Sequence, residues 1–276
     1  MMHEKQRVEL GAVEETLLVP LYLRALESRR KRPIVVDPKA AEMVDRIDWD
    51  YARIGQRWRG MGCSLRCAFF DAWAADFIRN HPEGTVVEIG CGLNTRFDRL
   101  DNGRIHWFDL DLPDVISLRR RFFADSERCT MLAASVVDPG WIPAVLRSPG
   151  PYFLMAETVL VYLEEQRVKT ALAQIARGIP GARILLDTCS ARAVARANKD
   201  HARRGVAARF TWACADPNEI ERWNIGLRLV ESRTAADVPE SLKQRFSWLG
   251  RAVFGALHRL SPGFLKSYQL SVFEAD

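Results

Sequence analysis

The pattern of hydrophobic and polar positions divides the chain into two regions. Over residues 1–80 leucines recur at helical spacing, as at Leu17, Leu18, Leu21 and Leu26, so this region is predicted to be helical. From residue 85 onward, short apolar runs alternate with amphipathic stretches. Such alternation favours an α/β fold in which helices cover both faces of a parallel sheet. The predicted strands are 85–89, 104–109, 129–133, 151–156 and 182–188, and the predicted helices are 95–100, 114–123 and 164–179.

The later part of the chain adds two predicted strands, at 227–230 and 268–273, and two insertions. Residues 190–209 are rich in alanine and arginine, and residues 239–264 carry apolar side chains at helical spacing. Both insertions are predicted to be helical. For residues 239–264, packing on the edge of the sheet is favoured over attachment to a membrane surface.

Composition narrows the class of protein. A chain of 276 residues can form one large domain, or one domain with a cap. The formal charge of +5 is spread along the chain, which permits an anionic ligand but does not indicate nucleic-acid binding. The six cysteines are dispersed without zinc-type spacing, the N-terminus is charged, and no apolar run approaches about 18 residues. These features predict a cytoplasmic protein with reduced thiols, no bound metal and no membrane insertion.

The segment from Thr85 to Thr95 contains the most informative motif. A β-branched run ends in Glu88, and a Gly-x-Gly turn follows at Gly90 and Gly92. Glycines let the backbone turn sharply and approach a ligand closely. A dinucleotide fingerprint would require a third glycine at Thr95, and an acidic residue before the turn suits a cationic or amino-bearing ligand better. The motif therefore favours S-adenosylmethionine over NAD or FAD, with an ordinary structural turn as the alternative.

The next predicted strand ends in two acidic residues, Asp109 and Asp111. Asp111 lies 21 positions beyond Gly90, roughly the spacing at which a strand–helix–strand unit places a carboxylate beside a ribose diol. The alternative is that both aspartates cap the following helix. Asp114, directly before the helical run, is the better cap, so a cofactor-binding role is favoured for Asp109 and Asp111.

Several segments together resemble the leucine carboxyl methyltransferase family, and in particular its bacterial branch of polyketide O-methyltransferases. The resemblance rests on residues 87–103, 107–116 and 154–163, and on the N-terminal segments 37–40 and 47–51, which occur in the family's order. It covers nearly the whole chain. One departure is Asn94, where the family usually has aspartate.

The resemblance implies a doubly wound, mostly parallel seven-stranded sheet of the class I methyltransferase type, with an antiparallel edge formed by the last two strands. It also implies that S-adenosylmethionine is the cofactor. Residues 1–80 would form a helical N-terminal cap, and residues 81–276 the cofactor-binding domain with its insertions.

The resemblance and the fold extend the predicted site beyond the Gly-x-Gly turn. Arg66, followed five residues later by Asp71, matches the family's cofactor arginine and would bind the methionine carboxylate; a helix-surface arginine is the alternative. Ser135, Val136 and Asp138 would border the adenine, unless they are ordinary turn residues. Glu157 would contact the cofactor, with a structural hydrogen bond as the alternative, and Tyr162 is the candidate catalytic residue.

The predicted reaction is methyl transfer to a carboxylate or hydroxyl of a small molecule, a polyketide or another natural product. Residues 1–80 and 190–209 would close over the site as a lid. The arginines of that insertion suggest an anionic or carrier-protein-bound acceptor, unless they face solvent; they are Arg192, Arg196, Arg203, Arg204 and Arg209. A carboxylate needs no general base at neutral pH, and the histidine expected to face the acceptor, His201, is not assigned as one. The alternatives are a non-catalytic cofactor-binding protein and a methyltransferase for a protein C-terminus.

Overall fold

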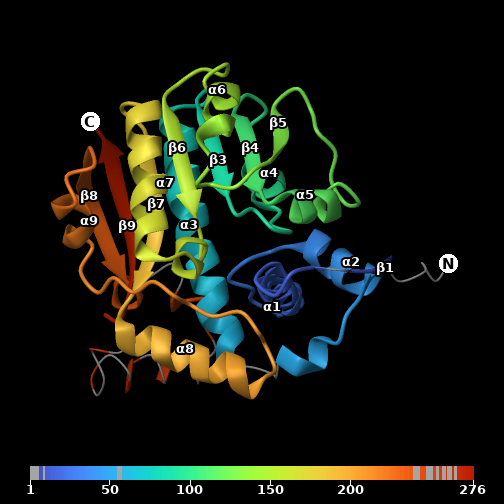
Figure 1. Cartoon of the computed structure of the whole chain (residues 1–276). Coiled ribbons are helices and arrows are strands. Elements are labelled where there is room, and N and C mark those ends of the chain that lie inside the picture. The colour runs from blue at the N-terminus through green and yellow to red at the C-terminus, as the bar shows by residue number, and fades with distance from the viewer. Residues whose placement is uncertain are drawn as a thin grey trace.

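A seven-stranded sheet organises the chain (Figure 1). The computed structural model describes residues 6–8, 10–54, 58–238, 243–246, 251–252, 255–256, 259, 263 and 266–276. The strand order is β5-β4-β3-β6-β7-β9-β8; the first five run parallel, and β9 is antiparallel to both of its neighbours. This confirms the predicted class I methyltransferase sheet with its antiparallel edge. The strands are β3 (Thr85–Ile89), β4 (His106–Asp111), β5 (Cys129–Ala133), β6 (Tyr152–Ala156), β7 (Arg183–Cys189), β8 (Leu227–Thr234) and β9 (Tyr268–Ala275).

Alternate residues of the central strands pack into two separate hydrophobic clusters, one on each face of the sheet. Val86 packs in a cluster with the side chains of the long helix α3, whereas Val87 packs in a cluster with those of α7. Phe153 of β6 stacks on Phe77 of α3, with ring centroids 5.2 Å apart. Since both faces are covered, the strands read as apolar runs. The flanking helices are α3 (Trp58–Asn80), α4 (Arg96–Leu100), α5 (Pro113–Arg119), α6 (Ile142–Val145), α7 (Glu165–Gly178) and α9 (Asn218–Arg222).

A second helical group lies beyond one end of the sheet, below it in Figure 1. Helices α1 and α2 share a hydrophobic cluster that includes Leu21 and Met43, and the cluster also includes Leu93 of the loop after β3. This helical group is therefore packed on the segment that carries the Gly-x-Gly turn. Its elements are η1 (Glu14–Leu17), α1 (Leu18–Ser28), α2 (Pro38–Arg46) and η2 (Tyr51–Ile54), and α8 (Ala191–Arg203) lies at the same end.

The structure corrects the expected helix around residues 114–123. Asp114 is not its N-cap, because the helix begins at Pro113 with Leu112 as the cap residue, and it ends at Arg119. Proline is favoured at a first helical position because that residue's N–H would have no helical partner. The second strand is also shifted, to His106–Asp111, so that Asp111 is its last residue.

One further difference concerns the N-terminal region, and the other observations concern short or late segments. Residues 1–80 were expected to lack strands, but Gln6–Arg7 (β1) pairs in parallel with Ile47–Asp48 (β2). The 3-10 turns Pro139–Trp141 (η3), Leu160–Tyr162 (η4) and Ala235–Asp237 (η5) lie in connections. The predicted helix at 239–264 lies largely outside the described residues. In the described part of the chain, no helix is both long and apolar enough to cross a membrane.

Candidate active site

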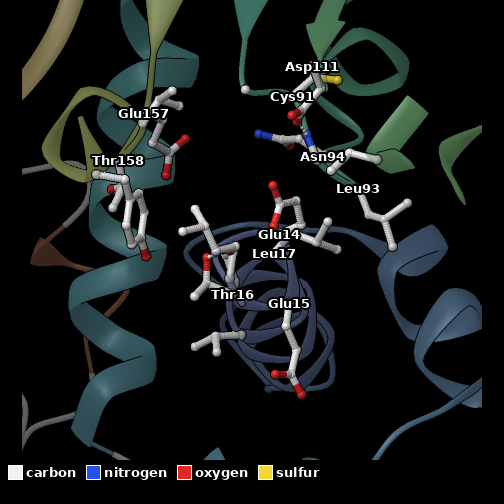
Figure 2. A pocket seen from close by; sticks show the side chains of 18 of the residues that line it. Glu14, Glu15, Thr16, Leu17, Cys91, Leu93, Asn94, Asp111, Glu157 and Thr158 are labelled. Atoms are coloured by element: carbon white, nitrogen blue, oxygen red, sulfur yellow. Dashed lines mark hydrogen bonds between the residues drawn. The ribbon is translucent and has the colours of Figure 1, made fainter. Parts of the chain in front are cut away.

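A cavity of about 360 Å³ lies where the central strands end (Figure 2). It is lined by the segments that follow β3, β4, β5 and β6, by η1 and α1, and by the end of α8 with the loop after it. From β3 the chain builds the sheet first toward β4 and β5 and then, on the other side, toward β6 and β7. The cavity therefore occupies the crevice where doubly wound folds bind their ligands.

The Gly-x-Gly turn forms one wall of the cavity and requires its glycines. Gly90 has φ +65°, and a Cβ there would lie 2.3 Å from Cγ2 of Val159. Gly92 has φ +50°, and its Cβ would lie 3.2 Å from Cβ of Leu17. Larger residues would be strained in this left-handed region, and at position 90 they would also collide with the turn after β6. The glycines thus let the loop after β3, the turn after β6 and η1 meet.

Asp111 lines the cavity and is held by two backbone amides. Its Oδ2 accepts from the Gly92 amide at 2.7 Å, and its Oδ1 accepts from the Leu112 amide at 2.8 Å. Burial raises the pKa of Asp111 to about 6, although both amide hydrogen bonds act to lower it. The carboxylate is therefore fixed in orientation, with lone pairs left for further donors.

Asp109, predicted beside Asp111 as a cofactor residue, does not line the cavity. It is buried and accepts from Arg119 Nη2 at 2.6 Å and from Trp107 Nε1 at 3.1 Å. Arg119 in turn donates to the carbonyl oxygens of Gly92 and Asn94, at 3.0 and 2.7 Å. Asp109 thus contributes to the site indirectly, by holding the arginine that supports the loop.

The residues predicted to contact the cofactor after β5 also differ in whether they line the cavity. Ser135 and Val136 line the cavity, and their place beside the adenine stays a prediction. Asp138 lies outside the lining and caps η3, where its side chain accepts from the Gly140 amide at 3.0 Å. The geometry of Asp138 matches the turn role that the sequence left open.

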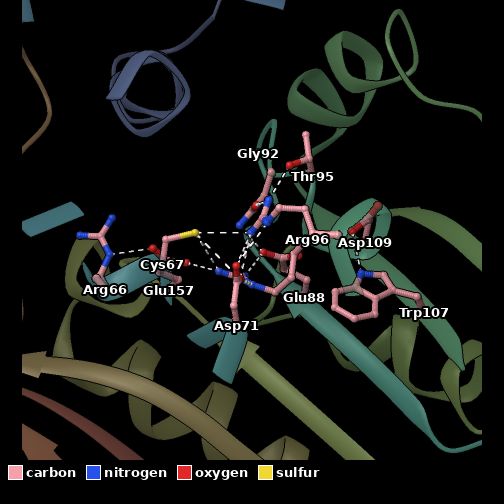
Figure 3. A network of polar contacts seen from close by, with 12 residues as sticks. Arg66, Cys67, Asp71, Glu88, Gly92, Thr95, Arg96, Trp107, Asp109 and Glu157 are labelled. Carbon is pink, nitrogen blue, oxygen red and sulfur yellow. Dashed lines mark hydrogen bonds and ion pairs between the residues drawn. The ribbon is translucent and has the colours of Figure 1, made fainter. Parts of the chain in front are cut away.

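A buried ion-pair network borders the cavity, and Arg66, Glu88 and Glu157 belong to both (Figure 3). Arg96 is 0% exposed and contacts three carboxylates: Asp71 at 2.6 Å, Glu157 at 2.5 Å, and Glu88. The second Glu157 oxygen accepts from Arg66 Nε at 2.8 Å. Glu157 thus bridges two arginines, which lower its pKa to about 2 despite burial. It remains a carboxylate throughout the physiological pH range.

Glu88 provides the clearest sign that the site is built for a ligand. It lines the cavity, is 2% exposed, and its Oε1 accepts from Asn94 Nδ2 at 2.7 Å as well as from Arg96. Its Oε2 is buried without a hydrogen-bond partner in the described part of the chain. Burial raises the pKa of Glu88 to about 7, although Arg96 acts to lower it. A buried acceptor without a donor is costly, so a ligand that donates a hydrogen bond fits here.

Aromatic side chains also line the cavity. The rings of Tyr162 and Phe210 meet edge to face with centroids 4.9 Å apart, and the His201 ring meets Phe210 at 5.2 Å. Nδ1 of His201 lies 3.0 Å from the carbonyl oxygen of Ala208. Because a carbonyl only accepts, the proton lies on Nδ1. Burial raises the pKa of Tyr162, although a hydrogen bond with Thr16 opposes it, so Tyr162 is a neutral phenol.

Only one of the five arginines in residues 190–209 lines the cavity. Arg204 lies there and donates to the Ile54 carbonyl oxygen. The other four are exposed, which is the solvent-facing alternative left open by the sequence; they are Arg192, Arg196, Arg203 and Arg209.

Sequence reasoning did not identify three polar residues of this site: Arg96, Arg24 and Asn94. Arg96 is the centre of the ion-pair network, and Arg24, which lines the cavity, pairs with Asp37 at 2.9 Å and donates to the Leu93 carbonyl. Neither arginine belongs to a recognisable spacing. Asn94 was noted only as a departure from the family. Its amide donates to Glu88, which an aspartate could not do.

Comparisons with known proteins agree with this architecture. The family model described as leucine carboxyl methyltransferase matches residues 18–176. The chain is 33% identical over 236 residues to the tetracenomycin polyketide synthesis O-methyltransferase TcmP of Streptomyces glaucescens, with 85% of this chain and 87% of the relative covered. It is 27% identical over 252 residues to the S-adenosyl-L-methionine-dependent methyltransferase dpfgK of Gibberella zeae, covering 83% and 84% of the two chains.

Among solved structures, the crystal structure of a DUF574 family protein from Streptomyces avermitilis aligns with a TM-score of 0.57. The alignment covers 96% of this chain and 100% of that one, at 14% sequence identity. At this identity the likeness concerns the fold alone.

Proposed function

The chain belongs to the leucine carboxyl methyltransferase family, and we propose that it methylates a carboxylate of a small natural-product molecule. It is an S-adenosylmethionine-dependent methyltransferase, as are its relatives. The observation that carries the proposal is that one cavity combines polar groups at the strand termini, called the polar end, with the rings of Tyr162, His201 and Phe210, called the aromatic end. The first end suits the cofactor, and the second suits an acceptor.

Four groups at the polar end fit S-adenosylmethionine, which supplies a methyl group on a sulfonium centre. Asp111 would accept from the ribose hydroxyls, since it is a fixed acceptor. The unpartnered Oε2 of Glu88 would accept from the cofactor's ammonium group. Arg66 would bind the cofactor's carboxylate while Glu157 holds its Nε. Residues 135–136 would border the adenine.

At the aromatic end the protein's contribution is alignment and the exclusion of water. Tyr162 and Phe210 would hold a planar or apolar acceptor, and the neutral Tyr162 hydroxyl would donate to its reacting group. Arg204 brings a positive charge to the same end. An acceptor carboxylate is already ionised at neutral pH, whereas a phenol with a pKa near 10 needs a base. A protonated tyrosine cannot be that base, so a phenol would need His201 for this role, whereas a carboxylate needs neither residue.

A methyl-transfer screen tests the proposal. Aromatic acids, phenols, carrier-bound acyl groups and a peptide with a free C-terminus are incubated with the enzyme and labelled cofactor, and the products are treated with mild base. We expect methylation of small acids and release of labelled methanol, because methyl esters hydrolyse and aryl ethers do not. A base-stable product would instead make the acceptor a hydroxyl, with His201 the first residue to test as its base.

A matched variant tests the role of Tyr162. Tyr162→Phe keeps the ring against Phe210 and removes only the hydroxyl. We expect kcat to fall about 3- to 10-fold, the equivalent of one hydrogen bond, with unchanged affinity for S-adenosylhomocysteine. An unchanged kcat on the best acceptor would remove Tyr162 from the reaction.

A further inference from the structure

The turn after β6 contains an unusual backbone conformation. Thr158 has φ +56°, in the left-handed region that β-branched residues rarely adopt. Asn224 is the other described non-glycine residue with positive φ, and asparagine tolerates that region. Thr158 lines the cavity between Glu157 and the segment that leads to Tyr162 (Figure 2). Strain of this kind persists only where the surroundings enforce it.

The enforcing group is Asp187, a buried residue of β7 that lies outside the cavity lining. Its Oδ1 accepts from the Thr158 amide at 2.7 Å, and its Oδ2 accepts from the Thr158 hydroxyl at 3.0 Å. The Tyr268 hydroxyl of β9 donates to the same Oδ2. One carboxylate therefore receives three donors, two of them from the strained residue.

The residues on either side of Thr158 are fixed as well. Glu157 is held by two arginines, through Arg66 Nε at 2.8 Å and through an Arg96 contact at 2.5 Å. Val159 fills the space that a side chain at position 90 would need, 2.3 Å from the Cβ position of Gly90. The turn is thus held at Glu157 and Thr158 by side chains from different parts of the fold, and at Val159 it packs against the Gly-x-Gly turn.

We propose that Asp187 is a positioning residue for methyl transfer: it holds Thr158 in the left-handed conformation, and thereby fixes Glu157 and the approach to Tyr162 against the Gly-x-Gly turn. The inference rests on the proposed function, in which Glu157 contributes to cofactor binding and Tyr162 contacts the acceptor. Without Asp187, the Thr158 backbone would relax toward an ordinary conformation and carry both neighbours out of place.

A rescue experiment tests this role. Asp187→Ala removes all three acceptor contacts, and we expect it to weaken S-adenosylhomocysteine binding at least 10-fold and to lower kcat. Adding Thr158→Gly should restore most of the lost affinity, because glycine adopts φ +56° without a Cβ clash. The double variant is compared with Thr158→Gly alone, whose affinity sets the level that the rescue can reach. Failure of the double variant to regain affinity would overturn the inference, because loss of the Asp187 charge would then explain the defect.

The conservative variant Asp187→Asn gives an independent test, which can also be carried out if Asp187→Ala does not fold. Asp187→Asn keeps an oxygen for the Thr158 amide, so we expect affinity within about 3-fold of the wild type. An asparagine variant with a 10-fold or larger defect would also overturn the inference. Wild-type protein is titrated in parallel: if it fails to bind S-adenosylhomocysteine, the proposed function fails, whereas binding by the wild type without rescue rejects only the role of Asp187.

Discussion

Replacing Asp111 by alanine is the most direct test of where the cofactor binds. The variant loses two acceptor contacts to backbone amides, those of Gly92 and Leu112, and with them the proposed contact to the ribose. Hydrogen bonds to a charged group contribute about 1.5–3 kcal/mol each. We therefore expect cofactor affinity to fall by about 2–5 kcal/mol, which corresponds to about 30- to 4,000-fold in Kd.

Titration calorimetry with S-adenosylhomocysteine measures the loss. Asp111→Asn separates charge from shape, since its single carbonyl oxygen can accept from only one of the two amides; an intermediate loss is expected. Asp138→Asn is the matched control. Asp138 follows the neighbouring strand but caps η3 outside the cavity, and asparagine also caps, so affinity should not change.

An Asp111→Ala variant that folds and binds S-adenosylhomocysteine as tightly as the wild type would refute the reasoning. A thermal melt and near-ultraviolet circular dichroism establish folding in each case. A large loss in Asp138→Asn would show that the adenine end extends to η3.

Three further predictions concern the loop and its charges. Gly90→Ala should lower the free energy of unfolding by at least about 2 kcal/mol in urea denaturation, since φ +65° is strained for alanine and the new Cβ meets a neighbouring side chain. Asp109→Ala should lower it by about 3–5 kcal/mol, because Arg119 is left buried without its carboxylate. Affinity for S-adenosylhomocysteine should fall as pH drops through about 7 and then about 6, since Glu88 and Asp111 bind as carboxylates and are progressively protonated there; calorimetry from pH 8 to 5 checks this.

Each of these predictions has a control. Gly103→Ala, at φ +80° with open space around it, should lower the free energy of unfolding by less than Gly90→Ala does. An equal loss in the two variants would mean that the contact with the turn after β6 is unimportant. Asp45→Ala breaks the exposed pair with Arg29 and should leave stability within error. An affinity that does not change between pH 8 and 5 would exclude Glu88 and Asp111 as ionised ligands of the cofactor.

The strands of the sheet were predictable because each is marked by the character of its own consecutive residues. Every residue of β3 is buried, so the strand appears in the sequence as a run of β-branched residues interrupted only by Glu88. The glycine turn and the acidic ends of β3 and β4 were predictable for the same reason, since each is a short segment with one requirement. The ends of helices and strands were less predictable. The helix begins at Pro113, one residue before Asp114, which the sequence favoured as its cap.

The partners of the charged residues were not predictable, because they come together only in the fold. Asp71, Glu88, Arg96 and Glu157 lie in four separate segments of the chain, and their sequence spacing does not indicate that one arginine contacts the other three residues. The same holds for Asp109, whose sequence position resembles that of Asp111 but whose carboxylate is occupied by Arg119. The motif therefore assigned the same role to Asp109 and Asp111, whereas in the structure the two carboxylates have different partners.

The balance of charge in the network bears on which ligand the site accepts. Four arginines and four carboxylates are linked through consecutive ion pairs, and they are Arg24, Arg66, Arg96, Arg99, Asp37, Asp71, Glu88 and Glu157. A ligand with a net charge at this end would disturb that balance in a buried environment, at a high desolvation cost. A zwitterionic end, with an ammonium near Glu88 and a carboxylate near Arg66, adds one charge of each sign. We infer that the network favours an amino-acid moiety over a phosphate, which is the same choice that the missing third glycine at Thr95 indicates from the sequence.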